Sequence, residues 1–136
     1  MTTRVVEIVA GVIRDADGRV LTVRKRGTSA FMLPGGKREP GESDLAALSR
    51  ELGEELGCVL VGVDHLGTFD AEAANEPDTQ VHGAIYLAHI EGPVTALAEI
   101  EDLLWIDPTA PAAVRLAPLL ERHVLPHLLA TASPAG

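Results

Sequence analysis

The stretch Gly35–Cys58, GGKREPGESDLAALSRELGEELGC, joins a glycine turn to an acidic helix and decides how the chain around it folds. Four apolar residues recur in it at helical spacing: Leu45, Leu48, Leu52 and Leu56. At about 100° per residue they form one stripe, which predicts a helix over 43–56 whose leucines face a core. Ser43 or Asp44 can begin this helix, and Gly57 stands where a left-handed residue would end it.

Three glutamates, Glu51, Glu54 and Glu55, share one side of the predicted helix, beside the leucine stripe. Glu51 and Glu55 are like charges one turn apart, which is unfavourable unless something positive lies nearby. Clustered carboxylates suit Mg²⁺ or Mn²⁺, which take their other ligands from water and substrate phosphates. Arg50, one turn before Glu54, could orient that side chain or offset part of the charge. The pattern therefore predicts a divalent-cation site.

The glycines of this stretch indicate where the backbone must come close to something. Pro34-Gly35-Gly36 and Pro40-Gly41 keep the chain tight and free of bulky side chains, so a carbonyl or amide can approach an ion or phosphate. Gly53, inside the helix, costs about 1 kcal/mol relative to alanine, which suggests a helix face that needs clearance.

A set of fixed positions resembles the Nudix box of the MutT-like Nudix hydrolases: Gly36, Glu42, Arg50-Glu51-Leu52, Glu54-Glu55 and Gly57. Five residues separate the first two positions and seven separate the next two. Only Cys58 departs from the pattern, at a position where an aliphatic residue is usual, and a buried thiol behaves like a small hydrophobe. An ordinary amphipathic helix would explain the leucines but neither the glycine spacing nor the glutamates.

The resemblance implies an α/β fold, namely an α/β/α sandwich with a mixed sheet between helices. It also implies hydrolysis of a nucleoside diphosphate linked to another moiety, such as a nucleoside triphosphate or a nucleotide sugar. Mg²⁺, with Mn²⁺ as a substitute, would be bound by Gly35, Glu51, Glu54 and Glu55. These glutamates and Arg50 would be catalytic, with either Glu51 or Glu55 accepting the proton of the attacking water.

Substrate contacts are expected from five residues in and before the box: Arg24, Arg26, Gly36, Lys37 and Glu42. The two arginines flank Lys25 at the end of a predicted strand, and arginine binds phosphate oxygens in a bidentate way. Lys37 and its neighbour Arg38 could contact either phosphate or solvent. Glu42 could instead act with Arg50 as a positioning group.

Runs rich in Val and Ile predict strands on both sides of the box: 4–13, 19–25, 58–64, 66–69, 81–91 and 103–107. Residues 15–18 are expected to form a hairpin turn, and 70–79 a surface loop or a lip over the substrate. The resemblance to MutT-like proteins implies that an acidic residue before the last strand can reach the metal or act as a base, and the spacing leaves Glu99 and Glu101 both open. Trp105 is expected in the core.

The segment from Pro111 to Ala130 is predicted to be helical, broken or restarted at Pro118 and kinked at Pro126. His123 and His127 lie one turn apart on it. That spacing can bind zinc, but no third ligand is evident. Residues 131–136 are expected to fray.

Length and composition predict one domain, over residues 1–130, because 136 residues with 46% hydrophobic content suffice for one core. The net charge of −9 argues against nonspecific binding to nucleic acid or to an anionic membrane. Cys58 is the only cysteine, so no intrachain disulfide can form, and a cytoplasmic location is compatible. No signal peptide or membrane span is evident near the N-terminus. The expected partner is a nucleotide-type small molecule, bound by a monomer or homodimer.

Substrate identity stays open between an oxidised nucleotide, another nucleoside triphosphate, an ADP-sugar and a dinucleotide polyphosphate. The namesake of the MutT-like group reads oxidised guanine with an asparagine. This chain has no asparagine beyond Asn75, so that preference is not supported. A noncatalytic nucleotide-binding or regulatory Nudix domain is the alternative, although such a domain could lose a metal glutamate and this chain keeps all three. Isopentenyl diphosphate isomerases share the fold but resemble the chain less.

Overall fold

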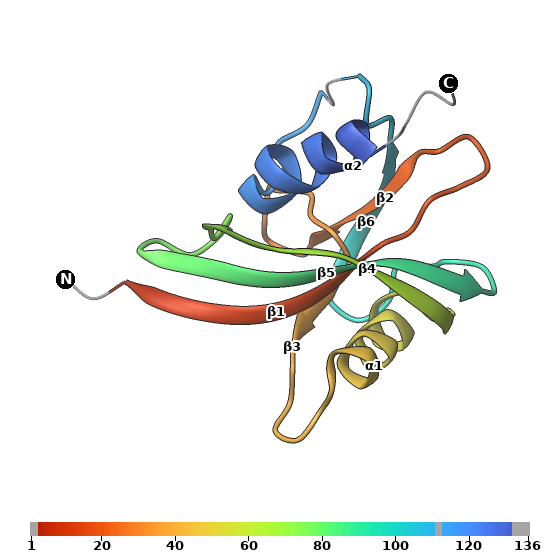
Figure 1. The fold of residues 1–136 in the computed structure, drawn as a ribbon, viewed down its shortest axis with the longest axis horizontal. Helices are drawn as coiled ribbons and strands as arrows, with labels where there is room; N and C mark the ends of the chain where they lie inside the picture. Colours follow the sequence, from red (N-terminus) through yellow and green to blue (C-terminus); the bar gives the residue numbers. More distant parts are fainter. Residues whose placement is uncertain (1–2, 111–112, 132–136) are drawn as a thin grey trace.

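The chain folds into two β-sheets flanked by helices, in a computed structural model that describes residues 3–110 and 113–131. Its elements are β1 (Arg4–Val12), β2 (Val20–Lys25), β3 (Gly35–Lys37), α1 (Asp44–Leu56), β4 (Val59–Glu72), β5 (Thr79–Glu91), β6 (Ile100–Ile106), η1 (Leu120–Val124) and α2 (Leu125–Thr131). The larger sheet has the order β3-β1-β5-β4, in which β1 and β5 are parallel and the other pairs antiparallel. Figure 1 shows α1 on one side of this sheet and α2 on the other. The expected α/β/α sandwich with a mixed sheet is confirmed.

Alternation along the central strand β1 builds the two halves of the core. Val9 packs in one buried cluster with the leucines of α1, whereas Ala10 packs in the other with Leu120 and Val124 of the C-terminal helix. Successive side chains of a strand point to opposite faces, so one strand supplies both clusters.

Helix α1 follows its predicted pattern except at the first leucine. Ser43 is the N-cap, its hydroxyl accepting a first-turn N–H at 3.1 Å, and Gly57 ends the helix with φ of 72°. The last three leucines of the stripe are fully buried, but Leu45 is 53% exposed, because the buried face of the helix begins only at Ala47. The prediction for Leu45 is therefore wrong. A methyl group on Gly53 would meet open space, so the expected need for clearance there is wrong too.

The turn over residues 15–18 forms, but the two strands that it joins enter different sheets. Gly18 has φ of 79° and its N–H donates to the Asp15 carbonyl at 3.0 Å. Beyond an isolated bridge between Arg14 and Val20, β2 pairs with β6. Both edges of β1 are occupied, by β3 and β5, so β2 has no place beside it.

The expected segments 58–64 and 66–69 are one strand, β4, whose register against β5 shifts between Leu60 and Gly62 and again between His65 and Gly67. Pairing continues to Glu72, which shortens the connection to β5 to residues 73–78. Trp105 is partly buried against the α1 side of the core, as expected.

The C-terminal helix begins later than predicted. Residues 113–117 are not helical, and Leu116 bridges to Phe31, since the chain before Pro118 favours an extended backbone. The helix starts at Pro118 and takes π-helical form over Leu120–Val124, where the Leu125 N–H donates to the Leu120 carbonyl just before Pro126. This wide turn accommodates the proline that was expected to kink the helix. Residues 111–112 and most of the predicted frayed tail lie outside the described residues. No described helix is long and apolar enough to span a membrane.

Candidate active site

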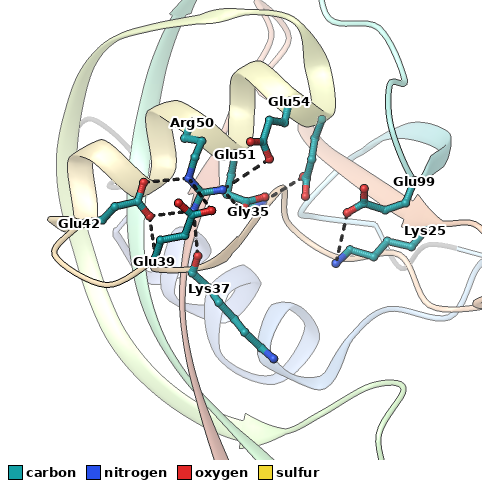
Figure 2. Close-up of polar contacts among 10 residues, drawn as sticks. Lys25, Gly35, Lys37, Glu39, Glu42, Arg50, Glu51, Glu54 and Glu99 are labelled. Atoms are coloured by element: carbon teal, nitrogen blue, oxygen red, sulfur yellow. Dashed lines mark hydrogen bonds and ion pairs between the residues drawn. The ribbon is translucent and has the colours of Figure 1, made fainter.

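Arg50 lies at the centre of the polar contacts between α1 and the loop before it (Figure 2). Its Nε and Nη2 donate to the two carboxylate oxygens of Glu42, each at 2.8 Å, and Nη2 also donates to the Lys37 carbonyl at 3.1 Å. Nη1 donates to Glu51 at 2.8 Å and to Glu54 at 3.5 Å. Hydrogen bonds from the guanidinium hold the pKa of Glu42 at about 2. Arg50 therefore ties the loop to the helix and orients Glu51 more firmly than Glu54.

Glu55 is the buried carboxylate of the site. It is 1% exposed, and its Oε1 accepts the Gly35 N–H at 3.2 Å. Its Oε2 is buried and has no hydrogen-bond partner among the described residues. Burial, reinforced by the neighbouring Glu51 charge, raises the pKa of Glu55 to about 8. A buried oxygen without a donor is costly, so this position needs either a proton or a cation.

The glycine turn lies directly against this helix face. A methyl group on Gly36 would lie 2.8 Å from the Glu51 carboxylate, and one on Gly35 would lie 2.2 Å from the Val9 carbonyl oxygen. Gly35 also has φ of 150°, which side chains rarely adopt. The close approach expected from the glycines is present at Gly35, which lies against backbone, and at Gly36, which lies against the movable Glu51 side chain, but a methyl group on Gly41 would meet open space.

The donor set fits a hard divalent cation. Glu51, Glu54 and Glu55 offer carboxylate oxygens on one face of α1, and the unpartnered Oε2 of Glu55 is available to an ion. Within residues 3–110 and 113–131, no three His, Cys, Asp or Glu side chains are grouped closely enough to hold a metal ion by themselves, so the three glutamates do not form a ready-made cage. Mg²⁺ does not require such a cage, because it usually keeps several waters and takes substrate phosphates as ligands.

The predicted alternative, a zinc site at His123 and His127, is not supported. Both rings pack on Phe69, with centroids 5.9 and 5.6 Å from its ring. The part of the chain that the structure describes supplies no third ligand.

A pocket of about 530 Å³ opens beside the glycine turn. Its polar end is lined by Gly35, Gly36 and Glu51, together with Lys25, Lys37 and Glu99. Its remaining walls come from β1, from the loop between β4 and β5, and from the start of the C-terminal helix, through residues that include Val6, Ile8, Asn75, Leu119 and Leu120. The pocket thus places two lysines beside carboxylates and continues into a chamber whose walls combine aliphatic side chains with Glu72, Asn75, Glu76 and Thr79.

Comparison with known proteins gives the family. The NUDIX domain matches residues 5–128. The chain therefore belongs to the NUDIX family. An "8-oxo-dGTP diphosphatase" of Haemophilus influenzae is 36% identical over 76 residues, a match that covers 53% of this chain and only 56% of that protein. The "CTP pyrophosphohydrolase" of Escherichia coli is 30% identical over 119 residues, covering 85% of each chain.

The fold comparison agrees with the family. The crystal structure of a MutT NUDIX hydrolase from Burkholderia pseudomallei superposes with a TM-score of 0.75 at 25% identity. The match covers 92% of this chain and 98% of that one. The resemblance to MutT-like Nudix proteins found in the sequence is confirmed.

In this NUDIX domain the end of β2 presents Lys25 to the pocket rather than either arginine. Arg24 pairs with Asp102, and Arg26 lies 3.5 Å from Glu101. The pairing of β2 with β6 shifts register between Arg24 and Lys25, so the regular alternation of side chains along the strand is interrupted at this point. The sequence favoured arginine for its bidentate chemistry, but it could not show that Asp102 and Glu101 engage the two arginines.

The structure also separates the two acidic candidates before β6. Glu99 lines the pocket, and its carboxylate lies 3.9 Å from the Lys25 ammonium (Figure 2). Glu101 pairs with Arg26 outside the pocket. Glu42 does not line the pocket either, so its contacts assign it to holding Arg50. Arg38 is engaged by Asp44 at 2.5 Å, away from the pocket.

Proposed function

We propose that this NUDIX chain is a divalent-cation-dependent hydrolase that cleaves the diphosphate linkage of a nucleoside diphosphate carrying a further group. A nucleoside triphosphate is the leading substrate class, because both relatives described above are named for one. The observation that carries the proposal is the buried, unpartnered oxygen of Glu55, whose other carboxylate oxygen accepts the N–H of Gly35, a residue that lines the pocket.

The residues divide into a cation-binding set and a phosphate-binding set. Glu51, Glu54 and Glu55 would hold Mg²⁺ or Mn²⁺ together with the Gly35 backbone. When bound, the ion would offset phosphate charge and lower the pKa of a bound water. Lys25 and the neighbouring Lys37 bring positive charge to the same end of the pocket, where the diphosphate would lie.

Arg50 keeps the catalytic carboxylates in place. A glutamate accepts the proton of the attacking water. Glu51 and Glu55 are the two candidates for that base. In the cation-free chain Glu55 is protonated near neutral pH, since its pKa is about 8, so it must lose that proton before it can act as the base. Glu99 lies across the pocket and could assist.

The expected setting is the cytoplasm, where the single buried cysteine stays reduced. The chain acts there as a monomer or homodimer.

The test is phosphate release from a panel of CTP, dGTP, 8-oxo-dGTP, ADP-ribose and a dinucleotide polyphosphate, with Mg²⁺ or Mn²⁺. Added pyrophosphatase reveals pyrophosphate, and added phosphatase reveals mononucleotide products. We expect metal-dependent turnover of at least one triphosphate, reduced about 100-fold or more in Glu55→Gln. Glu121→Gln makes the same chemical change at an exposed position and should keep full activity.

A result in which nucleotides bind but nothing is hydrolysed with either metal would reject the enzyme. It would favour the noncatalytic nucleotide-binding alternative. Turnover restricted to ADP-ribose or to the dinucleotide polyphosphate would support the hydrolase but reject nucleoside triphosphates as its substrate class.

A further inference from the structure

The loop between β4 and β5 forms one wall of the pocket and is fastened mainly at its ends. Four of its residues line the pocket: Ala73, Ala74, Asn75 and Glu76. At one end the Ala73 N–H donates to the Thr79 carbonyl at 2.9 Å, and at the other the Asp78 carbonyl accepts the Arg4 N–H at 3.0 Å. Among the described residues, the hydrogen bond that holds the middle comes from Arg115, whose Nη2 donates to the Ala74 carbonyl at 2.9 Å.

Arg115 is itself held in place by hydrogen bonds of its backbone and side chain. Its carbonyl accepts the Phe31 N–H at 2.9 Å, and the Ala117 N–H donates back to the Phe31 carbonyl at 2.8 Å. Its Nη1 donates to the Ser29 hydroxyl at 2.9 Å. One guanidinium thus joins two loops that are distant in the sequence.

The Ser29 side of this bridge is rigid. The Thr28 N–H and hydroxyl donate to the Lys25 carbonyl at 3.1 and 2.8 Å, and Arg24 donates to the Thr28 carbonyl at 2.8 Å. Thr28 and Lys25 both line the pocket. Arg115 therefore connects the 73–78 loop, which has few hydrogen bonds within the described part of the chain, to the segment of Thr28 and Ser29, which has several.

We propose that Arg115 is a positioning residue that fixes the 73–78 loop as the nucleotide-binding wall of the pocket. The proposal rests on the proposed function for its substrate. The side-chain partners of Arg115 lie in two loops, whereas the glutamates lie on α1. Loss of Arg115 should therefore weaken substrate binding and leave the chemical step nearly unchanged.

The experiment compares wild type with Arg115→Gln, Arg115→Lys and the control Arg19→Gln, whose native ion pair with Asp15 lies in the turn over residues 15–18. Backbone ¹⁵N relaxation is measured on the nucleotide-free protein, with CTP hydrolysis measured in parallel. We expect order parameters at residues 74–76 to fall from about 0.85 to below about 0.6 in Arg115→Gln. KM for CTP should rise about tenfold, with kcat within about twofold. The order parameters and KM of Arg115→Lys should lie between those of wild type and Arg115→Gln, since one ammonium cannot reproduce the forked contact of the guanidinium.

Unchanged order parameters at residues 74–76 would overturn the proposal. Direct contact between Arg115 and substrate would then explain any rise in KM, and Arg115→Lys would largely retain affinity. If Arg115→Gln does not fold, Ser29→Ala removes one partner, and a smaller loss of loop order is expected; no loss would again overturn the proposal. The relaxation data are collected without nucleotide, so they decide the proposal even if CTP is not hydrolysed.

Discussion

Replacing Glu55 by glutamine should stabilise the cation-free protein at alkaline pH. The native pKa of this carboxyl is about 8, whereas its ordinary value is 4.5. Between these values the folded state keeps a proton that the unfolded state releases, so wild-type stability falls as pH rises through this window. Each pKa unit corresponds to about 1.4 kcal/mol, so the wild type can lose at most on the order of 5 kcal/mol of unfolding free energy across this window. Relaxation of the surrounding protein and entry of water reduce the cost of the buried charge, so we expect a loss of about 2 kcal/mol. Glutamine keeps the shape of the side chain and has no charge to bury.

The assay is urea unfolding of wild type and Glu55→Gln with a chelator, at about pH 5 and about pH 8.5. The free energy of unfolding of the variant, relative to wild type, should rise by about 2 kcal/mol between these pH values. Saturating Mg²⁺ should then stabilise wild type at the higher pH by about 1–3 kcal/mol and the variant by much less.

A difference between wild type and variant that does not change with pH would refute the reasoning. It would show that the Glu55 carboxylate is already solvated or paired in solution. Glu121→Gln, at an exposed site, should follow wild type at both pH values and with Mg²⁺.

Four further substitutions test the residues around this carboxylate and the start of its helix. Gly36→Ala brings a methyl group against the flexible end of the Glu51 side chain, so the free energy of unfolding should change by less than about 1 kcal/mol while kcat falls at least about tenfold. Gly35→Ala brings a methyl group against backbone atoms, so the free energy of unfolding measured in urea should fall by about 3 kcal/mol or more. Arg50→Lys loses the forked contact and should lower kcat at least about tenfold with a higher metal requirement, measured by Mg²⁺ titration of turnover. Ser43→Ala removes the helix cap and should cost about 1 kcal/mol in thermal unfolding with little change in kcat.

The predictions that held depend on short sequence separations. Ser43 and Gly57 limit α1 as expected, because capping is decided within a few residues. The glycine turn lies against the glutamate face because the loop between them is short and Arg50 closes it. Sequence alone could therefore predict the helix, its ends and the glycine turn packed against it.

The predictions that failed depend on contacts across the chain. Whether β2 joins β1 depends on which strands already occupy both edges of β1, and those strands come from elsewhere in the sequence. The helix start moved from Pro111 to Pro118 because residues before it pair with Phe31 instead. The exposure of Leu45 has the same origin, since helical spacing predicts a stripe but not where the core ends.

This division explains why the reaction class can be inferred from the sequence and the substrate cannot. The carboxylates and the glycine turn that would bind a metal lie within Gly35–Leu56, so one stretch carries the chemistry. The chamber that would receive the rest of the substrate is built from β1, the 73–78 loop and the C-terminal helix. Those segments meet only in the folded chain, and Arg115 joins two loops of the pocket region from a position that no motif marks. Relatives can therefore share the box while differing in substrate, and the residues to exchange for a change of specificity are those of the chamber.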